Sequence, residues 1–409
     1  MDYQEKKYLE YYDKGYTACF DKALIAFSIF YALKESQLDY YDGIIMIVKQ
    51  LAFLVSLTFS LLSVLRNFKW SKYGIVAFIF LFFIPLYLRL SYHSNVLGST
   101  MLILAAYNIP FSHIAKMCLK GILLVFFIVL GSLALGLVED RLYFRDKAHF
   151  EKSNAHDLGF KYYSFSYLGM GIIQCCIYIW KKHISYRKIV FLLVVSYLFF
   201  IVTSTRLQLY ACTAFIVIFF AIPYIPRVIL HSKIMSCIAV ASYPVICILL
   251  YFFSKYFILS IFYDGYEELN EAMSNRLTMN EEAFMRYDVT LWGNNLDLDG
   301  SETTTDYFYI DSGFLHVLLG DGLVFTAVIL LLYSILTYKL FRSRAYYLYL
   351  WVLIYAILNI SNGFLVALLE NPILLLAFSD TESISSDYYL VEEDDEELEQ
   401  CVYEEEETC

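Results

Sequence analysis

The chain has 409 residues, of which 59% are hydrophobic and only 17% are charged, and its mean hydropathy is +0.57. Soluble domains carry about 25% charged residues, so a composition this apolar, gathered in long runs, excludes an ordinary soluble domain and predicts a membrane protein. The net charge of −11 does not indicate a nucleic-acid partner. The negative charge is concentrated in residues 379–409, which hold 14 acids and no Lys or Arg. We expect that segment to be a disordered, acidic cytoplasmic tail.

The rest of the chain, residues 1–378, is dominated by apolar segments. A membrane-spanning helix needs about 20 mostly apolar residues, because its backbone polar groups find no water inside the bilayer. We therefore predict an all-α, polytopic membrane protein with about 12 transmembrane helices. In chain order the expected helices cover 16–33, 43–65, 73–90, 95–110, 121–138, 163–180, 188–204, 207–223, 234–255, 312–338, 345–360 and 363–378.

The connectors between these segments alternate in charge. Basic residues in short connectors stay on the cytoplasmic side of a membrane. Five connectors are basic and hold no acid, namely 66–72, 111–120, 181–188, 225–233 and 339–344. We therefore expect both termini to be cytoplasmic, and the smaller loop 139–162 and the larger loop 256–311 to be extracytoplasmic. Because the N-terminal stretch is acidic and long before its first apolar run, we expect no cleavable signal peptide there.

Arg206 lies between segments 188–204 and 207–223, which we expect to form a tight helical hairpin that turns on the outer side. An arginine at the edge of a membrane usually faces a polar cavity, because its charge is costly to place in lipid. Its guanidinium can hold a phosphate through two parallel hydrogen bonds. The alternative is an interfacial arginine that reaches the headgroup region and caps a turn.

The large outer loop contains one segment with the pattern of a helix. Thr278 and Glu281 have the spacing of a capping box, and an apolar run follows them, so we predict a short amphipathic helix over 279–291. Acidic residues after it lack the spacing of an EF-hand, and no cysteine pair has C-x-x-C spacing, so we expect no metal site or disulfide framework. The acidic residues concerned are Asp297, Asp299 and Glu302.

Two arginines of this loop differ in their neighbours. Arg286 has Glu282 as an i,i+4 partner on the predicted helix, so an ordinary surface ion pair explains it as well as a function does. Arg276 precedes the predicted helix and has no such acid. We therefore expect Arg276 to be the better candidate for binding an anion.

Three acid–base groups lie in or beside the last apolar segments. Asp311 and His316 stand at the outer start of segment 312–338, where either can act as a general base toward a hydroxyl. The alternatives are a helix N-cap for Asp311 and a hydrogen-bonded interfacial residue for His316. Glu370 lies inside the last segment, beside Asn371 and Pro372, where an intramembrane acid indicates either a function or a structural kink.

Four motifs in this order resemble those of the Wzy-type bacterial polysaccharide polymerases, which are related in plan to O-antigen ligases. The resemblance covers roughly residues 110–335. It begins with Arg145 followed by "HDLGFKYYSFSY" (156–167) and continues with "TSTRLQL" around Arg206. It ends with "SNRL" and "RYDVTLWGNN" in the large loop and with "IDSGFLHVLLGDGLV" (310–324).

The resemblance implies a glycosyltransferase that joins undecaprenyl-pyrophosphate-linked oligosaccharide repeat units outside the bacterial cytoplasmic membrane. No cofactor, metal or nucleotide is then expected, and a flippase and a chain-length regulator are the expected partners. Such an enzyme needs cations for the pyrophosphate and a base for the acceptor hydroxyl. The implied roles are pyrophosphate binding for Arg206 and Arg276, with Arg145 and Arg286 as second choices; general base for Asp311 or His316; and sugar binding for Tyr287, Trp292 and Tyr309.

Two alternatives stay open from the sequence alone. An O-antigen-type ligase differs from the polymerase only in its acceptor. A flippase or transporter of lipid-linked oligosaccharide can also have twelve spans and buried arginines, but transporters tend to carry internal repeats and polar residues near the middle of the membrane. The crowding of charged residues into the outer loops favours an enzyme.

Overall fold

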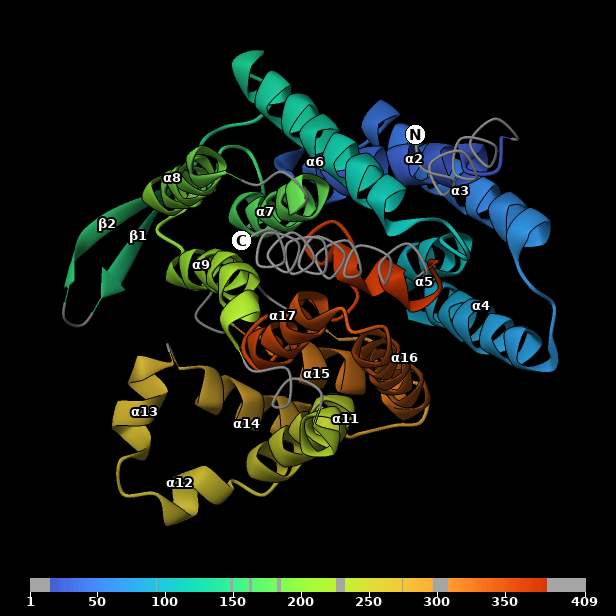
Figure 1. Cartoon of the computed structure of the whole chain (residues 1–409). Helices are drawn as coiled ribbons and strands as arrows, with labels where there is room; N and C mark the ends of the chain where they lie inside the picture. The colour runs from blue at the N-terminus through green and yellow to red at the C-terminus, as the bar shows by residue number, and fades with distance from the viewer. Residues whose placement is uncertain are drawn as a thin grey trace, which may run out of the picture.

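The computed structural model of the protein describes residues 15–92, 94–147, 150–161, 164–181, 185–225, 232–273, 275–296 and 308–380. Most of the expected acidic tail and the stretch with Asp297, Asp299 and Glu302 lie outside these residues. The described chain is a helical bundle with one β-hairpin (Figure 1). The all-α expectation therefore holds apart from that hairpin.

The elements up to the middle of the chain are α2 (Ala18–Lys34), η1 (Gln37–Tyr40), α3 (Ile44–Asn67), α4 (Lys72–Tyr92), α5 (Val96–Ala105), α6 (Phe111–Ala134), β1 (Leu142–Lys147), β2 (Phe150–His156), α7 (Ser164–Trp180), α8 (Tyr186–Thr203), α9 (Arg206–Ala221) and η3 (Ile222–Tyr224). The later ones are α11 (Lys233–Lys255), α12 (Ile258–Phe262), α13 (Tyr266–Ala272), α14 (Arg276–Arg286), α15 (Gly313–His316), η4 (Val317–Asp321), α16 (Gly322–Arg342), α17 (Tyr346–Leu358) and η5 (Pro372–Ala377).

Within the described residues, six helices are long and apolar enough to cross a membrane. They are α3, α4, α6, α8, α11 and the continuous helical stretch Gly313–Arg342 that contains α15, η4 and α16. Four further apolar helices, α5, α7, α9 and α17, are shorter. Large apolar side chains lie exposed along α3, α4, α8 and α11, as expected of helices that face lipid. The chain thus has the composition and the helices of a multi-pass membrane protein, whereas the count of twelve spans stays a prediction.

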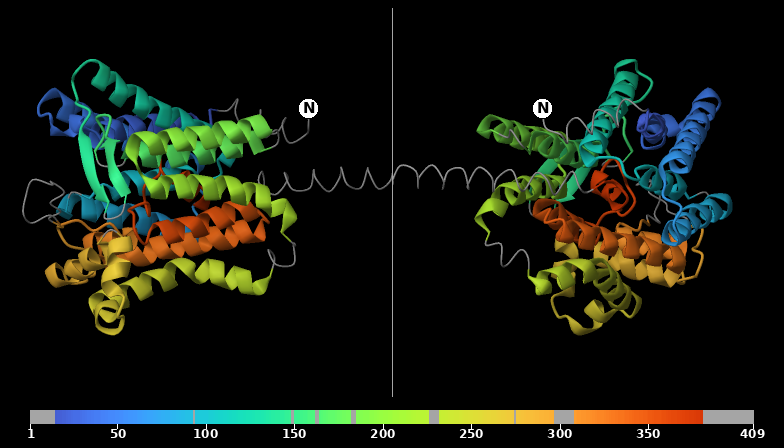
Figure 2. Two further views of the ribbon diagram at one scale, coloured as in Figure 1. Left: turned by 90° about the vertical axis from the view of Figure 1, so that its left-hand side faces the viewer. Right: turned by 45° about the vertical axis from the view of Figure 1, so that its right-hand side comes forward.

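The two expected outer loops lie at the same end of the bundle. Figure 2 shows the β1–β2 hairpin and helices α12 to α14 together at one end of the parallel long helices. We call this the loop end, and it also includes the turn at Ser204 between α8 and α9. Since the long helices alternate in direction, the described parts of the basic connectors lie at the opposite end, in agreement with the alternation in charge.

The last expected helix does not form. Residues 359–380 pass through the centre of the bundle as turns and the short 3-10 helix η5 (Figure 1), not as a helix over 363–378. α5, α6, α7 and α16 all contact η5, and most side chains of the segment are buried. Non-helical backbone is tolerated at membrane depth where protein encloses it and supplies hydrogen bonds. Here the Tyr333 hydroxyl donates to the carbonyl oxygen of Leu365 at 2.9 Å, and the Tyr355 hydroxyl donates to that of Glu370 at 2.5 Å.

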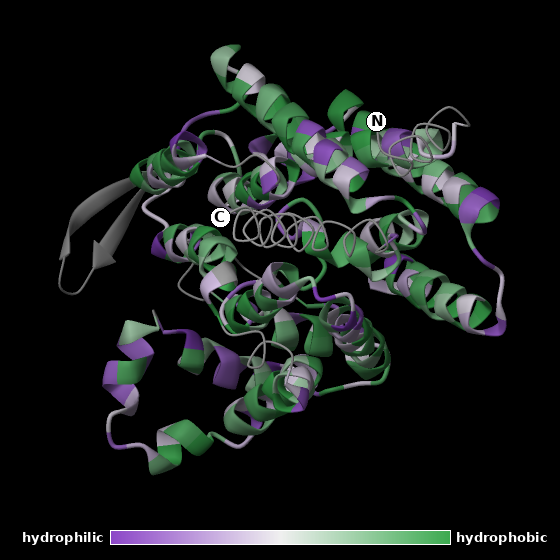
Figure 3. Ribbon diagram, in the orientation of Figure 1, coloured by the Kyte–Doolittle hydropathy of each residue, from purple (hydrophilic) through white to green (hydrophobic). Residues whose placement is uncertain are grey.

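Two other boundaries differ from the prediction. α6 begins at Phe111 rather than at 121, so the basic connector 111–120 is helical. In the large loop, α14 begins at Arg276, and its N-cap is Asn275 with a φ of 61° and no side-chain hydrogen bond to the helix. Thr278 therefore lies inside the helix, and the capping box does not form. Hydrophilic residues gather on α13 and α14, in contrast to the bundle helices (Figure 3).

Candidate functional site

A cavity of about 450 Å³ opens at the loop end. Its walls come from the end of α2, the junction of α4 and α5, the start of α7, residues 294–296, the stretch from Tyr309 to Asp321 and residues 363–370. Small-molecule sites are typically clefts of about 300–1,000 Å³ with an apolar wall and a few polar groups. This volume and these mixed walls fit such a site.

Most polar groups of the cavity carry hydroxyls or amides. These lining residues are Tyr31, Tyr92, Ser94, Asn95, Ser99, Ser164, Tyr167, Asn294, Asn295 and Tyr309. Hydroxyls and amides both donate and accept hydrogen bonds, which suits a ligand that is itself rich in hydroxyls. Phe27, Phe30 and Phe364 add aromatic surface to the same walls.

Four charged or chargeable groups share the cavity with His316. Lys34 and Glu35, at the end of α2, form an ion pair of 2.7 Å between Nζ and Oε1. Asp321 is 6% exposed, and its Oδ1 accepts a hydrogen bond of 2.8 Å from the Ser94 hydroxyl. Glu370 is 7% exposed and accepts a hydrogen bond from the Tyr31 hydroxyl. Three carboxyl groups therefore face one lysine.

His316 is the predicted base that lies in the cavity wall. It ends α15, whose N-cap is Ser312: the Ser312 hydroxyl accepts from the Leu315 N–H at 3.5 Å. The N-cap is thus Ser312 and not Asp311. Among the described residues, no hydrogen bond to the imidazole of His316 is found, so its ring nitrogens are available to a ligand in the cavity.

Asp311 and Arg276, predicted to have separate roles, form an ion pair. The Arg276 Nε lies 2.9 Å from the Asp311 Oδ2, and both side chains are mostly buried. Another nitrogen of the guanidinium, Nη1, donates to the Met273 carbonyl oxygen at 3.0 Å. The pair fixes α14 to the start of α15. Because the guanidinium engages the carboxylate of Asp311, the geometry favours His316 as the base.

The remaining predicted arginines lie elsewhere at the loop end. Arg206 begins α9 and is exposed. Arg286 forms the ion pair expected from its spacing, with its Nη2 2.5 Å from the Glu282 Oε1. Its guanidinium also lies over the Phe308 ring, 4.3 Å from the ring centroid. Neither arginine lines the cavity. Arg145 lies in β1, where the structure describes the backbone alone, paired in register with Ser153.

The three predicted sugar-binding aromatics are also separated. Tyr309 lines the cavity. Tyr287 packs near Phe308 with a ring-centroid distance of 6.2 Å. Trp292 is 46% exposed and meets the Tyr87 ring edge to face at 5.6 Å. Only Tyr309 of the three therefore shares a surface with His316.

The motif "WGNN" has a structural role beside the cavity. Helical hydrogen bonding is irregular at η4, and the Asn294 backbone N–H donates to the Leu319 and Gly320 carbonyl oxygens at 3.0 and 3.1 Å. The Leu323 N–H in turn donates to the Thr290 carbonyl oxygen at 3.0 Å. Gly293 has a φ of 88°, and a Cβ there would lie 2.1 Å from the Gly320 oxygen. This contact holds η4, and with it Asp321, in the cavity wall.

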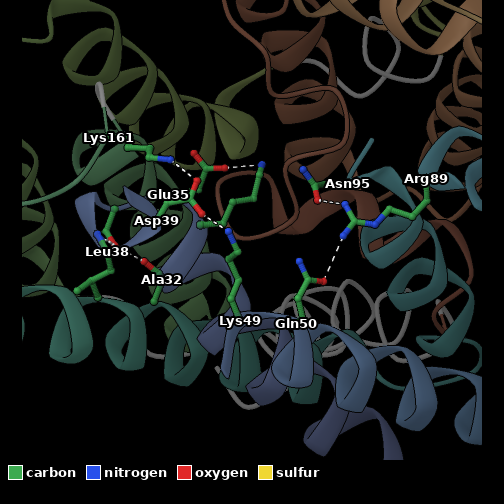
Figure 4. Close-up of polar contacts among 11 residues, drawn as sticks. Ala32, Glu35, Leu38, Asp39, Lys49, Gln50, Arg89, Asn95 and Lys161 are labelled. Atoms are coloured by element: carbon green, nitrogen blue, oxygen red, sulfur yellow. Dashed lines mark hydrogen bonds and ion pairs between the residues drawn. The ribbon is translucent and has the colours of Figure 1, made fainter. Parts of the chain in front are cut away.

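Sequence reasoning missed the contribution of the N-terminal helices. Figure 4 shows Asp39 between the ammonium groups of Lys49 and Lys161, and Arg89 donating to Asn95 at 2.9 Å. Burial alone would raise the pKa of Asp39, but hydrogen bonds and attraction from Lys161 and Lys49 hold that pKa below its usual range. This cluster joins η1, α3 and the loop after β2, directly after the end of α2 that lines the cavity.

One signal in the sequence could have identified Lys34. It directly follows an apolar segment on the expected outer side, where a charge at the end of a span often faces a polar space. As for metal binding, no group of three or more His, Cys, Asp or Glu side chains suited to a metal ion occurs in the part of the chain that the structure describes.

Comparison with known proteins gives no relative: no protein-family model, no curated protein and no solved structure matches the chain.

Proposed function

We propose that the protein is a membrane glycosyltransferase that polymerises lipid-pyrophosphate-linked oligosaccharide repeat units, like the Wzy-type polymerases that its sequence resembles. The observation that carries this proposal is the loop-end cavity, in which hydroxyl, amide and carboxyl groups surround the unengaged imidazole of His316. Such a lining suits the sugar of an acceptor whose hydroxyl must lose a proton. The six long apolar helices supply the membrane setting that a lipid-linked donor requires.

The proposed reaction needs a base, a leaving group and positive charge. The acceptor hydroxyl gives its proton to His316 while its oxygen bonds to the donor's anomeric carbon. The bond from that carbon to the lipid pyrophosphate breaks, and its electron pair leaves with the pyrophosphate. Lys34 lines the same cavity as His316, and Arg276 pairs with Asp311 just before the helix that carries His316. In this proposal these two cations stabilise the departing charge, with Lys34 leaving Glu35 for the pyrophosphate.

The sidedness that this function requires follows the positive-inside rule. With the basic connectors in the cytoplasm, the loop end faces the outside of the bacterial cytoplasmic membrane and both termini face the inside. Repeat units delivered by a flippase would then reach the cavity from the outer leaflet, and a chain-length regulator would act on the growing glycan.

The test is glycan length in cells that depend on this chain. His316→Ala should reduce polymerisation about 10²–10⁴-fold, the range that a general base contributes, and leave single repeat units. Arg276→Ala and Arg206→Ala should also shorten the glycan. Arg286→Ala is the matched control, because Arg286 pairs with Glu282 on the surface of its own helix, whereas Arg276 pairs with Asp311 just before the helix that carries His316. Membrane abundance of each variant is measured in parallel. Normal chain lengths in His316→Ala and Arg276→Ala at normal abundance would refute the proposal.

One observation favours a second candidate, a transporter of the same lipid-linked saccharide. Broken helices at the centre of a bundle are a common feature of transporters, and residues 359–371 form such a segment around the buried Glu370. The two functions differ in what accumulates when the protein fails. Loss of a polymerase leaves single repeat units on the outer leaflet, whereas loss of a transporter leaves them on the cytoplasmic leaflet.

A further inference from the structure

Glu370 is a buried carboxyl group that the proposed reaction does not use. It lies on the non-helical segment at the centre of the bundle, and it also belongs to the cavity wall. A charged group inside a membrane-spanning bundle is costly and usually functional. Its position raises the question of what balances its charge.

In the part of the chain that the structure describes, the hydrogen bonds of Glu370 are with neutral groups. The Tyr31 hydroxyl donates to its Oε1, and the Tyr355 hydroxyl donates to its backbone oxygen at 2.5 Å. Tyr355 in turn accepts a hydrogen bond of 2.5 Å from the Gln174 Nε2. Among the described residues, no lysine, arginine or histidine forms an ion pair with Glu370.

The charged groups around Glu370 do not supply a counter-ion. Lys34 of α2 is already engaged by Glu35 at 2.7 Å, so this pair brings no net positive charge. His316 and Asp321 of the α15–η4 stretch share the cavity, and Asp321 adds a further acid. Two tyrosines donate hydrogen bonds to Glu370, namely Tyr31 of α2 and Tyr355 of α17. Tyr333 of α16 donates to Leu365 of the same non-helical segment.

A buried carboxylate without a cation is strongly unfavourable, and in practice such a group takes up a proton instead. The cavity connects this carboxyl group to the loop end, so a proton has a route in and out. We propose that Glu370 is a proton-binding site at the floor of the cavity, which binds and releases a proton through the loop end with Tyr31 as its hydrogen-bond partner. Whatever fills the cavity then meets a wall whose charge depends on pH. The inference does not rest on the proposed enzymatic function.

Infrared spectroscopy of the full chain in lipid nanodiscs tests this directly, because a protonated carboxyl group has a carbonyl band that a carboxylate lacks. The wild type should show such a band near neutral pH and lose it on alkaline titration. Glu370→Gln should lack this band, since glutamine keeps the shape and the hydrogen bond but cannot titrate. Asp321→Asn is the matched control, because it removes the other buried carboxyl group of the cavity without freeing Lys34 from Glu35, and it should retain the band.

Two further measurements keep the proposal falsifiable if Glu370→Gln fails to fold. In Tyr31→Phe the band should remain but shift, because the carboxyl group loses its phenolic partner. Transfer of the wild type into D₂O should shift the band within the mixing time, because the cavity is open. A band unchanged in Glu370→Gln, a band position unaffected by Tyr31→Phe, or an exchange that takes hours would each overturn the proposal.

Discussion

A pair of glycine substitutions tests the passage of residues 359–380 through the bundle. Gly171 of α7 lies so close to this segment that an added Cβ would be 2.1 Å from the Leu369 carbonyl oxygen and 2.9 Å from the Ile122 Cδ1. Gly131 of α6 is the matched control, because a Cβ there would meet nothing within 4 Å. Both glycines are helical, and both lie in apolar helices.

The two substitutions to alanine share one effect and differ in another. Each variant has alanine in place of a helical glycine, and this change stabilises a helix in water by about 0.5–1 kcal/mol. Because both variants gain this stabilisation, it cancels in the difference between their stabilities, whatever its value is in a membrane. Only Gly171→Ala adds crowding, which costs about 1–3 kcal/mol in a packed core. Since the crowded Leu369 oxygen belongs to the backbone and cannot move aside, we expect a cost at the upper end of this range. The free energies of unfolding of the two variants should therefore differ by about 3 kcal/mol.

The assay is unfolding of each full-length variant by added SDS in mixed micelles, followed by circular dichroism. Gly131→Ala should unfold at the wild-type SDS fraction or above it, and Gly171→Ala should unfold well below it. If Gly171→Ala is as stable as Gly131→Ala, the segment around Leu369 does not lie against α7. That result would favour the continuous helix over 363–378 that the sequence predicts.

Three further experiments probe the loop end. Asp39→Asn removes the acid held by two lysines; because the pKa of Asp39 is lowered in the folded state, its stabilising effect is present at neutral pH and disappears as pH falls through that pKa. Stability measured against pH should therefore show Asp39→Asn about 1 kcal/mol weaker at pH 7 and equal to the wild type in acid. Gly293→Ala should cost more than about 2 kcal/mol in the same SDS unfolding assay, because its Cβ would strike the Gly320 backbone. A double-mutant cycle of Arg276→Ala and Asp311→Ala should show a coupling energy of about 1 kcal/mol, and additive effects would contradict the ion pair.

Local spacing was enough to predict the features that depend on neighbours in the sequence. The tight turn between α8 and α9 and the pairing of Glu282 with Arg286 both formed as expected. The alternation of basic connectors also agrees with the ends of the bundle at which they lie. These features follow from helical periodicity and from the length of apolar runs, which the sequence displays directly.

The contacts that shape the candidate site join residues far apart in the chain. Arg276 has no acid within its own helix, yet it pairs with Asp311, which belongs to the start of α15. Lys34 and Glu370 reach the same cavity from opposite ends of the sequence. No local pattern reports such contacts, so spacing alone left Arg276 without a partner and did not identify Lys34.

The unpredicted parts of the fold have a common physical cause. An apolar run of the right length indicates a helix only if its backbone polar groups have no other partners. At 359–371 the partners are Tyr333 and Tyr355, and at η4 they are the backbone groups around Asn294. Both irregular segments line the cavity, and each brings one carboxyl group, Glu370 or Asp321, to its wall. The cavity therefore lies where two apolar segments depart from regular α-helix, and polar residues on other elements make that departure stable.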